Sequence, residues 1–138
     1  MSAVAAQTDR RFRRAHVKPA RRKKSWRGLL VPLREDFSVR DLALALGLPL
    51  IVAARPGLGT INHTLLTLEA ARTRGLHVRA VVLTPWPSDP GELERSNRET
   101  IAALGDVEVA TLAPVGRPAA AELAGAGAAL PWRAWLAA

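Results

Sequence analysis

The residues best suited to chemistry lie where a predicted strand gives way to a predicted helix, at residues 54–63 (ARPGLGTINH). A glycine loop at residues 56–59 separates the two elements, and ligands of parallel α/β sheets bind beyond the carboxyl ends of the strands. The first N–H groups of a helix lack acceptors within the helix and lie at the positive end of its dipole. The N–H groups of Thr60, Ile61 and Asn62 therefore predict a site for a carboxylate or a phosphate, although an ordinary glycine turn fits the same residues.

The same glycines do not form a recognisable cradle for a nucleotide phosphate. The P-loop pattern G-x-x-x-x-G-K-[ST] requires a Gly-Lys pair, and none of the ten glycines is followed by lysine. The dinucleotide pattern G-x-G-x-x-G fails because Asn62 follows Gly57 and Gly59 where the third glycine belongs. The anion site at this loop is therefore predicted without a phosphate-binding motif.

The residue types give little support for a metal site or for a catalytic nucleophile. The chain has no cysteine, which excludes thiolate ligands, a cysteine nucleophile and disulfides, and it has no G-x-S-x-G motif. Its three histidines lie too far apart for typical metal-ligand spacing: His16, His63 and His77. We predict no metal site within the chain.

The elements that position the glycine loop follow from hydrophobic periodicity. Strands are expected at residues 29–31, 49–55, 78–83 and 107–112. Helices are expected at residues 42–46, 60–74 and 92–104, the first of them opened by a capping box, Ser38-x-x-Asp41. Strands that alternate with helices and are apolar throughout predict an α/β fold, a parallel sheet with flanking helices.

Three further expectations concern packing. The continuous apolar run at residues 49–55 predicts a strand buried on both faces. In the helix at 92–104, Ile101 and Leu104 are expected on the inner side. A helical turn at residues 132–136 is expected to close the core with its two tryptophans.

The charge is distributed unevenly along the chain. Residues 1–27 carry ten Lys/Arg and one acidic residue, Asp9, a net charge of +9, whereas residues 28–138 carry ten Arg and eleven Asp/Glu, a net charge of −1. We therefore expect a basic, disordered tail at 1–27 and one nearly neutral folded domain at 28–138.

The basic tail suggests an alternative function, nucleic-acid binding through phosphate neutralisation, with Phe12 and Trp26 among the basic residues. This alternative is disfavoured because the basic excess ends where the domain begins. The longest uncharged apolar run, residues 42–54, is too short to cross a bilayer, and the N-terminus lacks the apolar region of a secretory signal. A cytoplasmic protein is expected.

One stretch of the sequence resembles a known family. Residues 28–83, and above all GLGTINHT at 57–64, are similar to dethiobiotin synthetase, a biotin-pathway ligase. Residues 96–101 (SNRETI) fit the last helix of that family. The similarity covers residues 28–138, and GLGTINHT argues against other P-loop relatives such as cobalamin-pathway amidotransferases or partition-type ATPases.

The resemblance implies a reaction and a set of partners. The family uses ATP and Mg2+ to join CO2 to the two amines of diaminopelargonic acid, and a phosphorylated carbamate closes to the cyclic urea of dethiobiotin. The enzymes act as homodimers of P-loop NTPase-like fold. By this resemblance Gly59, Thr60, Ile61 and Asn62 hold the substrate carboxylate across the dimer interface.

The resemblance also implies a nucleotide site, of which this sequence keeps little. Thr84 stands where many members have an adenine-reading Asn, and Pro114, Val115 and Gly116 are weak candidates for the base loop. The family's P-loop, catalytic lysine and magnesium-binding aspartate lie upstream of the similar region, and Lys24 stands where an acidic ligand belongs.

These departures predict a P-loop NTPase-like fold that lacks its N-terminal P-loop half and is inactive alone, because phosphoryl transfer depends on positioning and charge neutralisation. The segment at 29–31 and its neighbours would then expose apolar edges. Two hypotheses explain such a chain: a frame disruption before Gly28, or a split enzyme whose P-loop half is a separate chain.

Overall fold

A computed structural model describes residues 28–116 and 119–137. The tail predicted at residues 1–27, with Lys24, lies outside the described residues, so its disorder stays a prediction. The chain divides into two compact units, Met1–Leu46 and Gly47–Ala138, which are described in turn.

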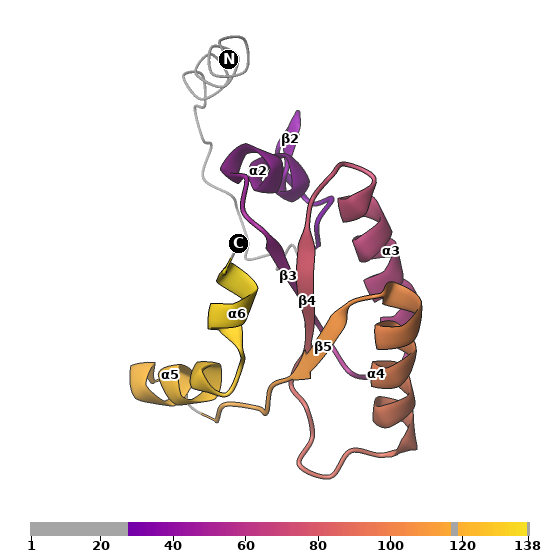
Figure 1. Ribbon diagram of the computed structural model, residues 1–138, viewed down its shortest axis with the longest axis vertical. Helices are drawn as coiled ribbons and strands as arrows, with labels where there is room; N and C mark the ends of the chain where they lie inside the picture. Colours follow the sequence, from indigo (N-terminus) through magenta and orange to yellow (C-terminus); the bar gives the residue numbers. More distant parts are fainter. Residues whose placement is uncertain (1–27, 117–118, 138) are drawn as a thin grey trace. The chain divides into compact units, whose positions relative to one another are not determined.

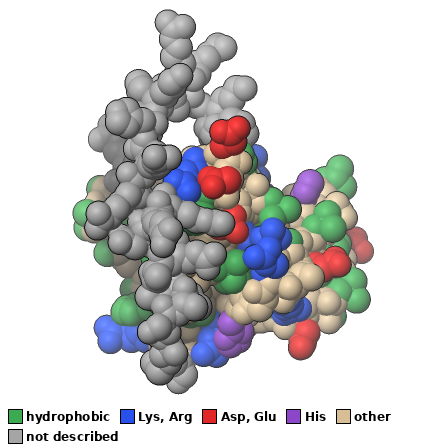
Figure 2. Space-filling view, turned by 90° about the horizontal axis from the view of Figure 1, so that it is seen from above, with side chains coloured by type: hydrophobic (Ala, Val, Ile, Leu, Met, Phe, Trp, Pro, Cys, Tyr) green, Lys and Arg blue, Asp and Glu red, His purple; other side chains and the backbone are tan. Residues whose placement is uncertain are grey.

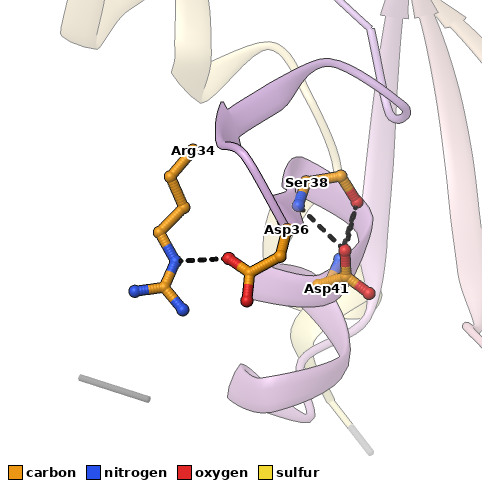
Figure 3. Close-up of polar contacts among 4 residues, drawn as sticks. All are labelled: Arg34, Asp36, Ser38 and Asp41. Atoms are coloured by element: carbon orange, nitrogen blue, oxygen red, sulfur yellow. Dashed lines mark hydrogen bonds and ion pairs between the residues drawn. The ribbon is translucent and has the colours of Figure 1, made fainter. Parts of the chain in front are cut away.

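The described part of the first unit is a small hairpin followed by a helix. Strands β1 (Pro32–Arg34) and β2 (Phe37–Ser38) pair antiparallel, and helix α2 (Val39–Leu46) follows directly. The backbone N–H of Asp41 donates to Ser38 Oγ at 3.3 Å, while Ser38 N and Oγ donate to Asp41 Oδ2 at 2.8 and 2.6 Å (Figure 3). The predicted capping box is confirmed, and it satisfies N–H groups that the helix leaves without acceptors.

The strand predicted at residues 29–31 is wrong. These residues form a turn in which Val31 N–H donates to the carbonyl of Gly28 at 3.2 Å, and the chain then enters the antiparallel hairpin. The tip of the hairpin carries an ion pair of 3.1 Å between Arg34 Nε and Asp36 Oδ1 (Figure 3). An apolar run of three residues is too short for periodicity to separate a strand from a turn.

The second unit contains the predicted parallel sheet. Strand β3 (Leu50–Ala54), strand β4 (Val78–Leu83) and strand β5 (Glu108–Thr111) pair in the order β3-β4-β5, all parallel. Each successive pair is joined through a helix, as parallel strands require. The α/β class inferred from the sequence is confirmed.

Helices cover both faces of this sheet. Helices α3 (Thr60–Arg72) and α4 (Glu92–Gly105) lie together on one face, and helix α6 (Trp132–Leu136) lies on the other (Figure 1). Helix α5 (Ala120–Ala128) connects β5 to α6 and contains no buried residue. The sequence did not predict α5, because an Ala/Gly run carries no amphipathic period.

Burial differs between the central strand and β3. In β4 every residue except one is buried, and Ala80 and Val82 form a cluster with Trp135 of α6. In β3 the side chains of Ile51 and Ala53 are exposed, so the prediction that this strand is buried on both faces is wrong. The reason is position: within the described residues β3 is an edge strand paired on one side only, whereas β4 is paired on both sides.

Helix α4 packs against α3 and buries a row of its residues spaced by four. The buried residues of α4 are Asn97, Ile101 and Gly105. A Cβ at Gly105 would lie 2.8 Å from Leu68 Cδ1 of α3, so glycine permits the close approach of the two helices. The prediction that Leu104 faces inward is wrong, since its side chain is 69% exposed. One residue is a rotation of about 100° around a helix, which carries Leu104 away from the inner row.

Helix α6 packs against the core on the second face of the sheet as expected, but with one of its two tryptophans only. Trp135 is 3% exposed and its Nε1 donates to Glu108 Oε2 at 2.9 Å, while Trp132 is 42% exposed and does not join the core. In the portion that the structure describes, no helix has the length and apolar character needed to cross a membrane.

Candidate ligand site at the carboxyl edge of the sheet

The three strands end level with one another, which brings their following loops to one edge. Ala54 pairs with Leu83 and Leu83 pairs with Thr111, so the last residues of β3, β4 and β5 are in register. The pairing continues one step further, because Thr84 N–H donates to Ala54 O at 2.8 Å and Leu112 N–H donates to Leu83 O at 3.0 Å. Ligands bind at this edge in parallel α/β sheets.

The glycine loop after β3 forms a tight turn into α3. Gly59 is the N-cap residue and has φ 82° and ψ −4°, a left-handed conformation that a residue without Cβ adopts readily. Thr60 N–H donates to Gly57 O at 3.2 Å, and the buried Thr60 hydroxyl lies 3.5 Å from Thr64 Oγ1. The expectation that the Thr60 N–H is available to a ligand is therefore wrong, because the turn itself uses that donor.

The next two N–H groups of α3 are available to a ligand. The first α-helical hydrogen bond runs from His63 N–H to Gly59 O at 3.2 Å. Neither Ile61 N–H nor Asn62 N–H has an acceptor within residues 28–116 and 119–137. The side chain of Asn62 is exposed beside them. Two adjacent donors at the positive end of a helix dipole can bind both oxygens of a carboxylate.

A residue that the sequence did not single out as functional holds this loop from α4. Asn97 is 5% exposed, and its Nδ2 donates to Pro56 O at 2.8 Å and to Gly57 O at 3.3 Å. The signal in the sequence was an Asn four residues before Ile101, on the inward row of a charged helix. A buried amide in such a row requires hydrogen-bond partners.

The weaker nucleotide candidates lie along the same edge. Thr84 follows β4, next to the glycine loop that follows β3, and residues 114–116 follow β5. Pro114 and Gly116 are exposed, Val115 is half-buried, and a Cβ at Gly116 would meet no atom within 4 Å. The fold thus brings both segments to the ligand edge, where Trp86 N–H of the loop after β4 donates to Leu112 O, directly after β5, at 2.8 Å.

The described part of the chain has no recognisable group of residues that would bind the phosphates of ATP or a magnesium ion. No group of three His, Asp or Glu residues there is arranged to hold a metal ion, and no glycine of the sequence is followed by lysine. The described residues therefore do not fit a nucleoside triphosphate with its metal, and no reaction step through that group follows from them.

A cleft of about 600 Å³ lies apart from the glycine loop, between α4, β5 and the loop at Trp86 and Pro90. Its charged lining is mixed, with two arginines and two glutamates: Arg95, Arg98, Glu99 and Glu108. None of the predicted site residues lines it.

Figure 2 shows basic and acidic side chains interspersed on the described surface of one face, in keeping with the net charge of −1 for residues 28–138.

The parallel sheet, its helices on both faces and a glycine turn at the carboxyl edge define an α/β protein. A family model described as an AAA domain, AAA_26, matches residues 25–118. The chain belongs to this family.

Individual relatives are more specific. The chain is 45% identical over 110 residues to the ATP-dependent dethiobiotin synthetase BioD of Mycobacterium avium, covering 79% of this chain and 49% of that protein. It is 49% identical over 89 residues to the ATP-dependent dethiobiotin synthetase BioD of an Anaeromyxobacter species, covering 58% and 40%. The protein of the same name from Rhodococcus erythropolis is 43% identical over 90 residues, covering 64% and 40%.

These relatives confirm the resemblance to dethiobiotin synthetases that GLGTINHT at residues 57–64 indicates. The chain spans about half the length, or less, of the curated relatives it matches.

Proposed function

We propose that this chain is the substrate-binding part of a cytoplasmic dethiobiotin synthetase, an ATP- and Mg2+-dependent ligase that joins CO2 to diaminopelargonic acid and closes the ring of dethiobiotin. One observation carries the proposal. A helix start with two available N–H groups lies at the ligand edge of the sheet, in a chain whose relatives bear that enzyme's name.

The proposed ligand at this position is the carboxylate of diaminopelargonic acid. The N–H groups of Ile61 and Asn62 donate to its oxygens, and the exposed Asn62 amide adds a third donor within reach. Gly59 turns the chain without a Cβ, so the backbone stays accessible to the ligand. Thr60 serves the turn through its N–H and is buried, so its part is to fix the start of the helix.

We further propose that the active form is a homodimer in which a second copy covers this site. Leu58, in the glycine loop, is 94% exposed, and Leu66 of α3 is 54% exposed. Large apolar side chains exposed beside a ligand site favour burial in an interface. The second copy would then shield the carboxylate from water and strengthen its hydrogen bonds.

The phosphoryl-transfer part of the reaction is proposed to need residues beyond those described. Phosphoryl transfer relies on cradling the phosphates and neutralising their charge, and the described chain carries neither a Gly-Lys pair nor an acidic metal cluster. We expect the purified chain to bind diaminopelargonic acid and to form no dethiobiotin. Activity would return on adding a chain that carries the P-loop half.

The test is a pair of measurements on the full 138-residue chain. Calorimetric titration with diaminopelargonic acid should detect binding. Asn62→Ala should weaken this binding about tenfold, because one hydrogen bond to a charged group is lost. The control Glu69→Ala, at the exposed far end of α3, should leave the affinity unchanged. Incubation with ATP, Mg2+, bicarbonate and diaminopelargonic acid should give no dethiobiotin. Absence of binding would refute the substrate site, and turnover would refute the need for a further P-loop segment.

A further inference from the structure

We propose that Asn97 is a positioning residue for this site: its side-chain amide holds the glycine loop so that the start of α3 presents its N–H groups to the ligand. The proposal rests on the proposed function for the identity of the ligand. The contacts on which it depends lie entirely within the second unit.

Asn97 is the one polar member of the buried row of α4. At 5% exposure its amide has almost no access to water, and it reaches across 41 residues of sequence to donate to Pro56 O at 2.8 Å. Pro56 is itself buried, so its carbonyl needs a protein donor. Packing alone would place an apolar residue at this position, next to Ile101 in the same row.

The connection to the ligand site runs through a single carbonyl. Gly57 O accepts from Asn97 Nδ2 at 3.3 Å and from Thr60 N–H at 3.2 Å. Asn97 and the first residue of α3 are therefore tied to the same atom, and Ile61 and Asn62 are the next two residues of the helix. A shift of Gly57 would move the turn that aims their N–H groups.

The loop has few other constraints. Gly57 and Gly59 have wide conformational freedom, a Cβ at Gly57 would meet no atom within 4 Å, and Leu58 between them is 94% exposed. Because these residues have so little packing of their own, the position of the loop is set by the end of β3, the start of α3 and the Asn97 amide. A loop without this anchor would sample several conformations. It would lose conformational entropy on binding the carboxylate, and this cost would weaken the binding.

The experiment compares variants that remove the donor but keep the volume of the side chain. Asn97→Leu replaces the amide by an apolar group of similar size, Asn97→Asp keeps the shape but replaces Nδ2–H by an acceptor, and Ser96→Ala is the control on the exposed side of the same helix. The readouts are the Kd for diaminopelargonic acid and the backbone amide resonances of Gly57, Gly59 and Val81, the last in the buried strand β4.

We expect both Asn97 variants to weaken binding about tenfold or more, as the loss of a buried hydrogen bond implies. The Gly57 and Gly59 resonances should shift or broaden while that of Val81 stays in place, and Asn97→Gln, which keeps the donor, should recover part of the affinity. Wild-type affinity with unchanged glycine resonances in a folded Asn97→Leu or Asn97→Asp protein would overturn the proposal.

A merely structural role gives a different pattern. In that case the variants would unfold at lower denaturant concentration, and the folded fraction would keep the wild-type Kd and glycine resonances, which also overturns the proposal. If the wild-type chain binds no diaminopelargonic acid, the proposed function fails. The glycine resonances of the Asn97 variants then still decide whether Asn97 positions the loop.

Discussion

Replacement of Gly105 by alanine tests the packing of α4 against α3. Gly105 is the last residue of α4 and is buried, and an added Cβ would lie 2.8 Å from Leu68 Cδ1, 3.2 Å from Val107 Cγ1 and 3.5 Å from Leu65 Cδ2. The first of these separations is shorter than carbon atoms tolerate. Leu68 is 2% exposed, so its side chain cannot turn into solvent to make room.

Two opposing effects set the magnitude. Forcing a methyl group into a packed core costs about 1–3 kcal/mol. Replacing glycine by alanine in a helix returns at most about 1 kcal/mol, and less at the last helical residue, where the backbone is only partly fixed. We therefore expect Gly105→Ala to lower the free energy of unfolding by about 1–2 kcal/mol.

Gly125→Ala is the matched control. Gly125 is exposed within α5, and a Cβ there would meet no atom within 4 Å, so only the propensity effect acts and stability should rise by about 0.5–1 kcal/mol. Urea denaturation followed by circular dichroism measures both variants, and their midpoints should move in opposite directions. A Gly105→Ala protein as stable as the wild type would refute the close approach of the two helices.

Three further changes test other features. Ser38→Ala removes the capping box and should cost about 1 kcal/mol, seen as faster amide hydrogen exchange in the first turn of α2; unchanged protection would contradict the cap. Leu58→Ser should raise the dimer dissociation constant at least tenfold in sedimentation experiments, because burial of a leucine contributes about 1.5–3 kcal/mol, and a dimer of unchanged strength would place the interface elsewhere. Deletion of residues 1–27 should abolish any salt-sensitive binding to DNA; binding that persists would show that the folded domain, not the tail, carries the affinity.

The sequence predicted those parts of the fold that a local pattern determines. The apolar run at 78–83 became the buried central strand, and Ser38 and Asp41 formed the expected cap, because each depends on neighbouring residues. The hairpin at 32–38 was missed because its pairing depends on a turn between short strands. The exposure of Ile51 was missed because periodicity does not reveal whether a strand is central or at an edge.

In the candidate site too, the sequence predicted the features that depend on neighbouring residues and missed those that depend on the folded structure. The glycine turn and the two available donors of α3 follow from sequence, since any helix start leaves such groups. That Thr60 uses its N–H within the turn could not be predicted, because it depends on the conformation of Gly57 and Gly59. Nor could the part of Asn97, because its partners lie 40 and 41 residues away and only the folded sheet brings them together.

The long reach of Asn97 has a consequence for the order in which the protein assembles. During synthesis the residues of the glycine loop and all of α3 leave the ribosome well before α4 does, and a contact between residues 41 apart costs loop-closure entropy before it contributes stability. The helix start therefore acquires its final orientation only once β4 is in the sheet and α4 has docked. A nascent chain interrupted before residue 97 would already contain every residue of α3 that is proposed to face the ligand, but it would lack the Asn97 contacts that hold the glycine loop.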